Sequence, residues 1–178
     1  MRLTLKLTSA MATTALAVLA AGAAPASADV PGPSSARDSR ASMAELDGRT
    51  IDLSKGWQGA DECAVSNGKT TCVDLDETIG KSVRDERASC TEDWVCIWED
   101  AGYGGRMLRF NDEYWHNLSS YDFSNKASSL WNRQNDLVGS DNAYLADGES
   151  GGGWQLKFSE GTKVSQLGHN DDASSIYG

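Results

Sequence analysis

The sequence predicts an all-β protein built around a two-fold pseudo-symmetric β-sandwich, and two observations carry this prediction. Apolar and polar residues alternate in "RMLRF" (106–110) and in "WQLKF" (154–158), as is typical of strands. The chain also repeats itself. "WEDAGYGGRMLRF" from Trp98 matches "YLADGESGGGWQLKF" from Tyr144, and "NKASSLW" from Asn125 matches "DDASSIY" from Asp171. Two units of about forty residues are each too small to close a core alone, so we expect them to pair.

The first 28 residues have the pattern of a secretory signal peptide. Arg2 and Lys6 form a positive n-region, an apolar stretch follows, and Ala26-Ser27-Ala28 fits a cleavage site. Removing 28 of the 178 residues leaves a mature chain of 150, enough to bury a sizeable core. No later segment reaches the roughly 18 apolar residues that span a bilayer, so we expect an extracellular protein.

Charge restricts the partners of the mature chain. The formal net charge is −10, and it becomes −12 when the two basic residues of the signal peptide are removed. Such an acidic chain disfavours nucleic acid and anionic membrane as partners and favours cations, above all calcium. We expect a monomer.

Residues 29–44 hold two of the three prolines and almost no large apolar side chain, which predicts a disordered leader. Residues 45–88 should form a small extension of short strands, a hairpin and a helix. In this segment "DETIGKSVRDERA" (76–88) places Ile79 and Val83 four residues apart behind an acidic first turn, which predicts a short amphipathic helix. The repeats then define a domain over residues 89–178.

The four cysteines predict two disulfides, because an even number in an oxidising compartment favours bridges over metal thiolates. Asn67-Gly68 is a strong two-residue hairpin signal, and counting outward from it places Cys63 opposite Cys72 in a non-hydrogen-bonded pair, where side chains lie closest. Cys90 and Cys96 remain as the second pair.

Each repeat contains an aromatic residue, a glycine and a serine-rich end: Trp98 with Gly105, and Tyr144 with Gly151. Together these features resemble the paired Greek-key motifs of the βγ-crystallin superfamily, over about 85 residues. The resemblance implies two Greek keys in a crystallin-like sandwich. It also implies that the aromatic and the glycine shape a folded hairpin, which a serine closes by hydrogen bonding.

The same resemblance implies calcium binding. "NDDASS" (170–175) fits the superfamily's calcium pattern, so Asp171 would supply a side-chain oxygen to one ion, while Asp172 would supply a backbone carbonyl and Ser174 a hydroxyl to the other. "SNKASS" (124–129) keeps Asn125 and Ser128 but has Ser124 at the first position and Lys126 at a free one. We therefore expect one calcium ion, with two as the alternative.

Within the superfamily, the Cys90–Cys96 pair and "WVCIWEDAGYGGRMLRF" (94–110) are similar to the secreted actinobacterial metalloproteinase-inhibitor family. This similarity implies inhibition of extracellular thermolysin-like zinc proteases. In that family the reactive bond lies in a disulfide loop in the second half of the domain, whereas here no cysteine follows Cys96. The similarity therefore assigns no reactive bond to this chain.

From the residues themselves, the rigid tip at Asn67 and Gly68 is the candidate inhibitory loop, with a purely structural staple as the alternative. The alternative function is a calcium-binding extracellular module without inhibitory activity. We expect no catalysis, because the only histidines are His116 and His169 and no nucleophile, zinc-protease or phosphate-loop motif is present. We expect both histidines in surface or loop positions. Glycan stacking on the tryptophans is a weaker interpretation than their use in the core.

Overall fold

The computed structural model describes residues 42–75, 89–135 and 141–178, all within one compact unit that spans residues 31–178. The predicted signal peptide, most of the predicted leader and the predicted helix at 76–88 lie outside the described residues. Met43 and Ala44, which the sequence assigns to the leader, belong instead to the first strand, because Ala44 is buried in the core.

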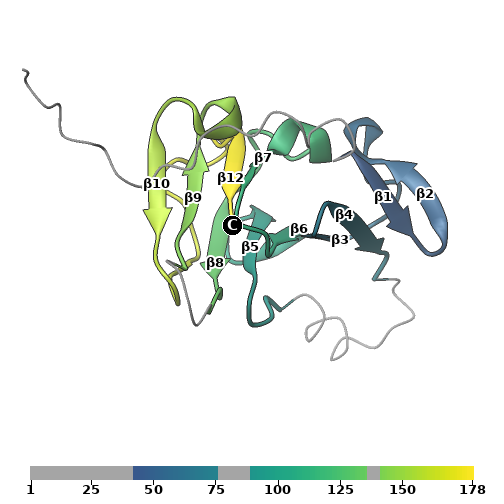
Figure 1. Cartoon of the computed structure of the whole chain (residues 1–178), viewed down its shortest axis with the longest axis horizontal. Helices are drawn as coiled ribbons and strands as arrows, with labels where there is room; N and C mark the ends of the chain where they lie inside the picture. Colours follow the sequence, from purple (N-terminus) through teal and green to yellow (C-terminus); the bar gives the residue numbers. More distant parts are fainter. Residues whose placement is uncertain (1–41, 76–88, 136–140) are drawn as a thin grey trace, which may run out of the picture. The chain divides into compact units, whose positions relative to one another are not determined.

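Two antiparallel Greek-key units form the centre of the fold (Figure 1). The first unit contains strands β5 (Val95–Asp100), β6 (Gly104–Phe110), β7 (Trp115–Asn117) and β8 (Ser129–Asn132), with the 3-10 helix η3 (Leu118–Tyr121). The second contains β9 (Ala143–Ala146), β10 (Gln155–Phe158), β11 (Lys163–Val164) and β12 (Ser175–Tyr177), with the 3-10 helix η4 (Glu149–Gly151).

The two units exchange their third strands. β7 of the first unit pairs with β12 of the second, and β11 of the second pairs with β8 of the first. The strand orders are β10-β9-β12-β7 in one sheet and β11-β8-β5-β6 at the start of the other. Each sheet therefore needs a strand from both repeats, which confirms the predicted crystallin-like sandwich and explains why neither unit closes a core alone.

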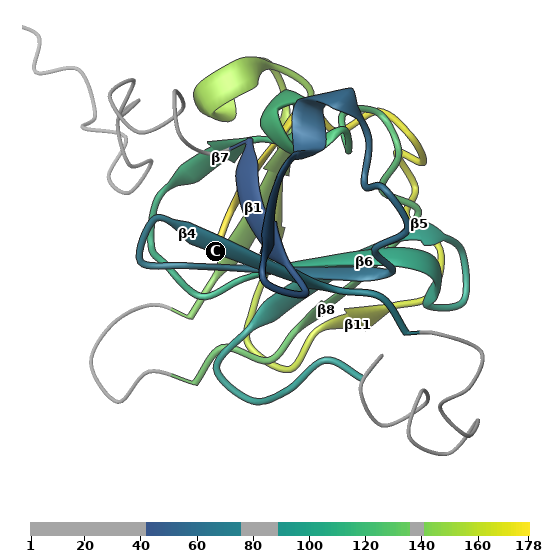
Figure 2. The same ribbon diagram turned by 90° about the vertical axis from the view of Figure 1, so that its right-hand side faces the viewer.

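The N-terminal segment extends the larger sheet. It consists of β1 (Met43–Leu46), β2 (Arg49–Asp52), the 3-10 helix η2 (Leu53–Lys55), β3 (Glu62–Ser66) and β4 (Lys69–Val73). β3 pairs in parallel with β6, and the sheet continues through β4 and β1 to β2. Figure 2 shows β4, β6, β8 and β11 of this eight-stranded sheet in one layer. The sequence predicts that this segment is a small extension packed on the domain. In the structure it instead continues the sheet of the domain.

One continuous apolar core joins the N-terminal segment to both repeats. Leu53 and Trp57 share this core with Leu108 and Phe110 of β6 and with Ile176 of β12. A second, smaller cluster lies on the other face of β5 and β6, where Trp98, Met107 and the Cys90–Cys96 bridge are buried. Alternation along β6 therefore places apolar residues on both faces, because both faces are covered.

Both predicted disulfides are confirmed. Cys63 and Cys72 lie directly opposite each other in the β3–β4 hairpin with a Cα–Cα distance of 4.1 Å, and Cys90 is bridged to Cys96. The observed hairpin register repeats the predicted one pair by pair, from Ser66 with Lys69 to Cys63 with Cys72. The turn itself has positive φ at Asn67 and Gly68, 51° and 71°, which is the type I′ geometry that favours this dipeptide.

Gly151 has both a left-handed backbone, with φ of 79°, and a close neighbour. A Cβ atom placed there would overlap the indole ring of Trp115, which comes from β7 of the other repeat. We expect Gly151→Ala to lower the free energy of unfolding by at least about 2 kcal/mol, since backbone strain and overpacking add.

Gly161→Ala is the matched control for this prediction, because Gly161 has φ of 74° but nothing within 4 Å of a built Cβ. Urea denaturation of both variants separates the two contributions, since only Gly151→Ala adds the clash to the backbone strain. Equal losses of stability would contradict the predicted clash with Trp115.

Candidate functional site

The repeated Ala-Ser-Ser step has two separate roles in the structure. Its second serine closes the folded hairpin of each repeat. The Ser129 hydroxyl donates to Asp100 O at 2.8 Å and accepts from the Tyr103 N–H at 3.1 Å. The Ser175 hydroxyl likewise donates to Gly148 O at 2.6 Å and accepts from the Gly151 N–H at 3.0 Å. Both serines are fully buried, so these are structural contacts.

The first serine of the step faces the other repeat. The Ser128 hydroxyl donates to Asp171 Oδ1 at 3.1 Å, 43 positions along the chain. Two backbone hydrogen bonds hold the segments together, from the Asn125 N–H to Ala173 O at 2.8 Å and from the Asp171 N–H to Ala127 O at 3.1 Å. Asn125 and Asp171 share a left-handed backbone, with φ of 56° and 57°. The structure thus brings the two predicted calcium segments side by side.

The remaining predicted ligands have other contacts. Asp172 is exposed, with its carboxylate 3.7 Å from His169 Nδ1. Ser174 is half-buried, and its N–H donates to Ala146 O at 2.8 Å. Lys126 donates from Nζ to Asp122 O at 2.9 Å and to Asp122 Oδ1 at 2.8 Å. A cation beside Asn125 could therefore take only the backbone carbonyl of Lys126.

The two segments offer a cation few carboxylates. Among the residues that the structure describes, no three His, Cys, Asp or Glu side chains group so as to hold a metal. A calcium ion here would therefore take its ligands from the Asp171 carboxylate together with hydroxyl, amide and main-chain oxygens, which are hard donors that calcium accepts.

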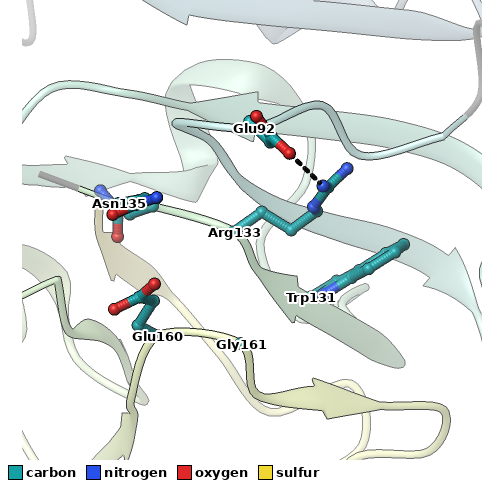
Figure 3. Close-up of a pocket in the computed structure, with 7 residues that line it drawn as sticks. Glu92, Trp131, Arg133, Asn135, Glu160 and Gly161 are labelled. Carbon is teal, nitrogen blue, oxygen red and sulfur yellow. Dashed lines mark hydrogen bonds and ion pairs between the residues drawn. The ribbon is translucent and has the colours of Figure 1, made fainter.

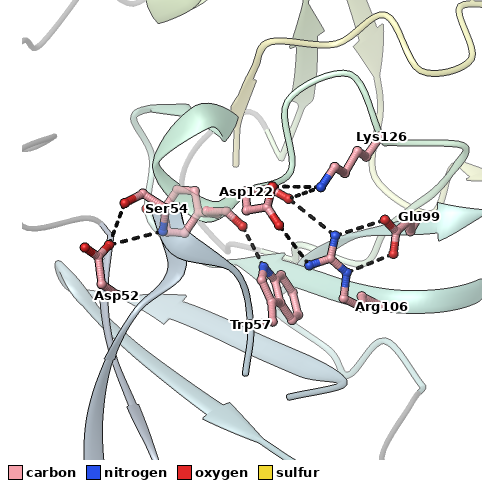
Figure 4. Close-up of polar contacts among 8 residues, drawn as sticks. Asp52, Ser54, Trp57, Glu99, Arg106, Asp122 and Lys126 are labelled. Carbon is pink, nitrogen blue, oxygen red and sulfur yellow. Dashed lines mark hydrogen bonds and ion pairs between the residues drawn. The ribbon is translucent and has the colours of Figure 1, made fainter. Parts of the chain in front are cut away.

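Arg106 links this region to the N-terminal segment (Figure 4). Its guanidinium makes a two-pronged pair with Glu99 at 2.8 and 2.9 Å, lies 3.4 Å from Asp122 Oδ2, and stacks over the Trp57 ring at 4.7 Å. Trp57 in turn donates from Nε1 to Tyr121 O at 2.6 Å. Hydrogen bonds from Arg106 lower the pKa of Glu99 despite partial burial. Burial alone would raise the pKa of Asp122, but bonds from Lys126 and Arg106 outweigh it and lower the pKa.

His116 is buried, so its expected surface position is wrong. Its Nε2 lies 2.8 Å from Asp112 Oδ1 and its Nδ1 lies 3.1 Å from the Tyr121 hydroxyl. The ring is also packed against Phe110 and Tyr114. All three residues of β7 are buried, and the two polar neighbours satisfy the ring nitrogens of His116 there. His169 is exposed, as expected.

Two exposed loops are tethered by disulfides. The first is the β3–β4 hairpin, whose tip at Asn67, Gly68 and Lys69 is exposed. The second is the segment between Cys90 and Cys96, in which Thr91, Glu92 and Asp93 are exposed while both cysteines are fully buried. The Asn-Gly turn signal marks only the first loop as a candidate, although the shorter cysteine spacing makes the second the tighter ring.

Two arginines hold the Cys90–Cys96 loop. Arg133 donates to Cys90 O at 2.7 Å and to Glu92 Oε1 at 3.2 Å, and Arg109 donates to Thr91 Oγ1 at 3.2 Å. The backbone is paired as well, because the Asp93 N–H donates to Arg133 O at 2.9 Å and the Arg133 N–H donates to Trp94 O at 2.8 Å. The guanidinium of Arg109 lies 4.8 Å from the centre of the Trp94 ring.

A pocket of about 300 Å³ adjoins this loop (Figure 3). The residues that line it come from the loop, from β8 and the segment after it, and from the turn before β11: Glu92, Trp131, Arg133, Gln134, Asn135, Glu160 and Gly161. Figure 3 shows Glu92 joined to Arg133, with Glu160 and Asn135 on the other side of the pocket.

Comparison with known proteins supports the predicted resemblance. The model of peptidase inhibitor family I36 matches residues 83–139, a segment that contains the Cys90–Cys96 loop, Asn125 and Ser128. Comparison with curated proteins finds no match. The described residues contain no helix that is both long and apolar enough to cross a membrane.

Several solved structures of βγ-crystallin domains are similar to this chain. A βγ-crystallin from Ciona intestinalis is 24% identical over 47% of this chain and 96% of its own, with a TM-score of 0.38. The N-terminal domain of protein S is 18% identical over 47% and 92%, with a TM-score of 0.37. A βγ-crystallin domain from Clostridium beijerinckii is 19% identical over 47% and 93%, with a TM-score of 0.36.

The lowered pKa values of Glu99 and Asp122 predict an acid-dependent loss of stability. Their contribution is fully present above their ordinary pKa values of 4.5 and 3.8, and it is lost as the pH falls below them. Urea denaturation between about pH 6 and pH 3 should therefore show a falling free energy of unfolding. Arg106→Gln should flatten this dependence, whereas Arg49→Gln, an exposed control, should not. An unchanged slope in Arg106→Gln would contradict the assignment.

Proposed function

We propose that this chain is a secreted, non-catalytic inhibitor of extracellular peptidases, and that thermolysin-like zinc metallopeptidases are its targets. The match of residues 83–139 to peptidase inhibitor family I36 is the observation that carries the proposal. The metallopeptidase class rests on the similarity of residues 90–110 to secreted metalloproteinase inhibitors.

Two loops that are closed by disulfides suit the described part of the chain to this role. Inhibitors gain affinity when the contacting loop is already ordered, because less conformational entropy is lost on docking. Both exposed tethered loops meet this condition, since a buried disulfide closes each of them. Disulfides also persist in oxidising compartments, which agrees with the signal-peptide pattern of residues 1–28.

The oxidised mature chain, starting at Asp29, should inhibit thermolysin at micromolar concentration in a peptide-hydrolysis assay. Subtilisin, a serine peptidase, is the matched comparison. Inhibition of subtilisin but not of thermolysin would contradict the metallopeptidase class and keep the inhibitor role. If neither enzyme is inhibited, both the metallopeptidase class and the inhibitor role are contradicted.

We propose calcium binding as a second property, because the Ser128–Asp171 contact joins the two predicted calcium segments. One ion between these segments would be held by the Asp171 side chain and the Ser128 hydroxyl. Asn125 and the main-chain carbonyl of Lys126 are the further donors in the first segment. The Asp172 carbonyl and the Ser174 hydroxyl would serve the second ion, if two bind.

Thermal unfolding in EDTA and in about 1 mM calcium tests this site. A dissociation constant near 10 μM would stabilise the folded chain by about 2.7 kcal/mol, which corresponds to a rise of several degrees in Tm. Asp171→Ala, which removes the side-chain oxygens, should abolish the shift. Asp47→Ala is the matched control, because Asp47 is also exposed with positive φ, 49°. A shift that survives in Asp171→Ala would place the ion elsewhere.

A further inference from the structure

The family match separates the two tethered loops. It covers residues 83–139, so it includes the Cys90–Cys96 loop and leaves out the hairpin tip at Asn67 and Gly68. The tip is also explained by the fold alone, because positive φ at both residues is what a two-residue hairpin needs. The Cys90–Cys96 loop is therefore the one to examine for contact with a peptidase.

This loop is held in place by several contacts and is nevertheless exposed to solvent. Cys90 and Cys96 are fully buried, and Arg133 fixes the loop through Cys90 O at 2.7 Å and through two backbone hydrogen bonds. The residues between the cysteines nonetheless reach solvent, and the Glu92 side chain is 78% exposed. A loop held in this way loses little entropy when a partner binds it.

The exposed part of the loop is acidic. Glu92 pairs with Arg133, whereas no described residue hydrogen-bonds or ion-pairs with the carboxylate of Asp93. The pocket beside the loop adds the exposed carboxylate of Glu160. The pocket lining therefore contains two carboxylates, those of Glu92 and Glu160, and one guanidinium, that of Arg133.

The positive charges near the pocket are already engaged by neighbouring groups. Arg133 donates to Cys90 O and Glu92, and its guanidinium lies 5.0 Å from the Trp131 ring centre. Lys163 Nζ lies 3.8 Å from the same ring. Gln134 also lines the pocket, and it is 9% exposed. Its Oε1 is buried and has no hydrogen-bond partner among the described residues, which is costly for a buried acceptor.

We infer that the Cys90–Cys96 loop and the pocket beside it form the peptidase-contacting surface, and that the pocket receives a positively charged side chain of the peptidase. A lysine or arginine side chain brings donors that the exposed side-chain oxygens of Glu160 and Asn135 can accept. In the complex, the carboxylate of Asp93 contacts positively charged groups of the peptidase that surround that side chain. This inference rests on the proposed inhibitor function and names the surface that carries it.

Inhibition of thermolysin by full-length mature variants is the first test. Asp93→Asn and Glu160→Gln each remove one charge, and Asn is tolerated at the left-handed backbone of Asp93, with φ of 67°. Each should raise the inhibition constant by about tenfold or more. Glu45→Gln, an exposed carboxylate on β1, is the charge-matched control and should leave the constant unchanged.

The second test needs no peptidase. Nα-acetyl-arginine amide is titrated into the ¹⁵N-labelled chain at millimolar concentration, and the Trp131 indole and Gln134 side-chain amide NMR signals are followed. Both signals should shift, and the shifts should be lost in Glu160→Gln. The citrulline analogue has the same shape without the charge and should cause no shift.

The outcomes separate the two ideas. Inhibition by the wild type that Asp93→Asn and Glu160→Gln leave unchanged would overturn the inference and keep the proposed function. If the arginine amide binds but neither thermolysin nor subtilisin is inhibited, the proposed function is overturned, and the peptidase contact is overturned with it. Recognition of a cation by the pocket would still hold. No signal shift with the arginine amide would overturn the pocket assignment.

Discussion

The two buried serine hydroxyls that close the folded hairpins are the contacts on which the rest of the structure depends. Ser129 and Ser175 each bond to both sides of a hairpin that begins with a strand and bends back through a glycine. With the bend held in this way, β7 and β11 are free to cross into the sheet of the other repeat. Each sheet is completed only by this exchange, so the fold requires both copies of the motif. The two copies differ in most other residues.

The same geometry explains why one short motif serves structure and chemistry together. In each Ala-Ser-Ser step the alanine is fully buried and the second serine bonds within its own hairpin. In the first copy, the first serine, Ser128, turns toward Asp171 of the opposite repeat. Alternation along the extended chain forces these different directions. The backbone hydrogen bonds of Asn125 and Asp171 hold the polar residues before each motif beside the partner motif.

Much of this could be predicted from local signals. The Asn67-Gly68 turn specifies its own register, so the Cys63–Cys72 bridge follows by counting, and the internal repeat specifies the sandwich. Other features depend on distant contacts. Nothing local indicates that β3 joins β6 in parallel, because the pairing connects residues 45 positions apart. Burial of His116 needs Asp112 and Tyr121 beside it, and the role of Arg133 needs the return of β8 to the Cys90–Cys96 loop. A sequence pattern records which residue types alternate, and it does not record which strands become neighbours.

The parallel pairing of β3 with β6 also has a consequence for the behaviour of the chain in solution. A strand at the edge of a sheet offers unpaired backbone groups to any other strand it meets, which is a route to aggregation. Without residues 42–75, β6 would be such an edge, seven residues long with apolar side chains on both faces, Met107 on one and Leu108 and Phe110 on the other. The N-terminal segment covers it and moves the edge outward to β2, a four-residue strand with exposed Arg49 and Thr50. The segment therefore replaces a long edge that carries apolar side chains with a short polar one, which disfavours edge-to-edge association of two copies.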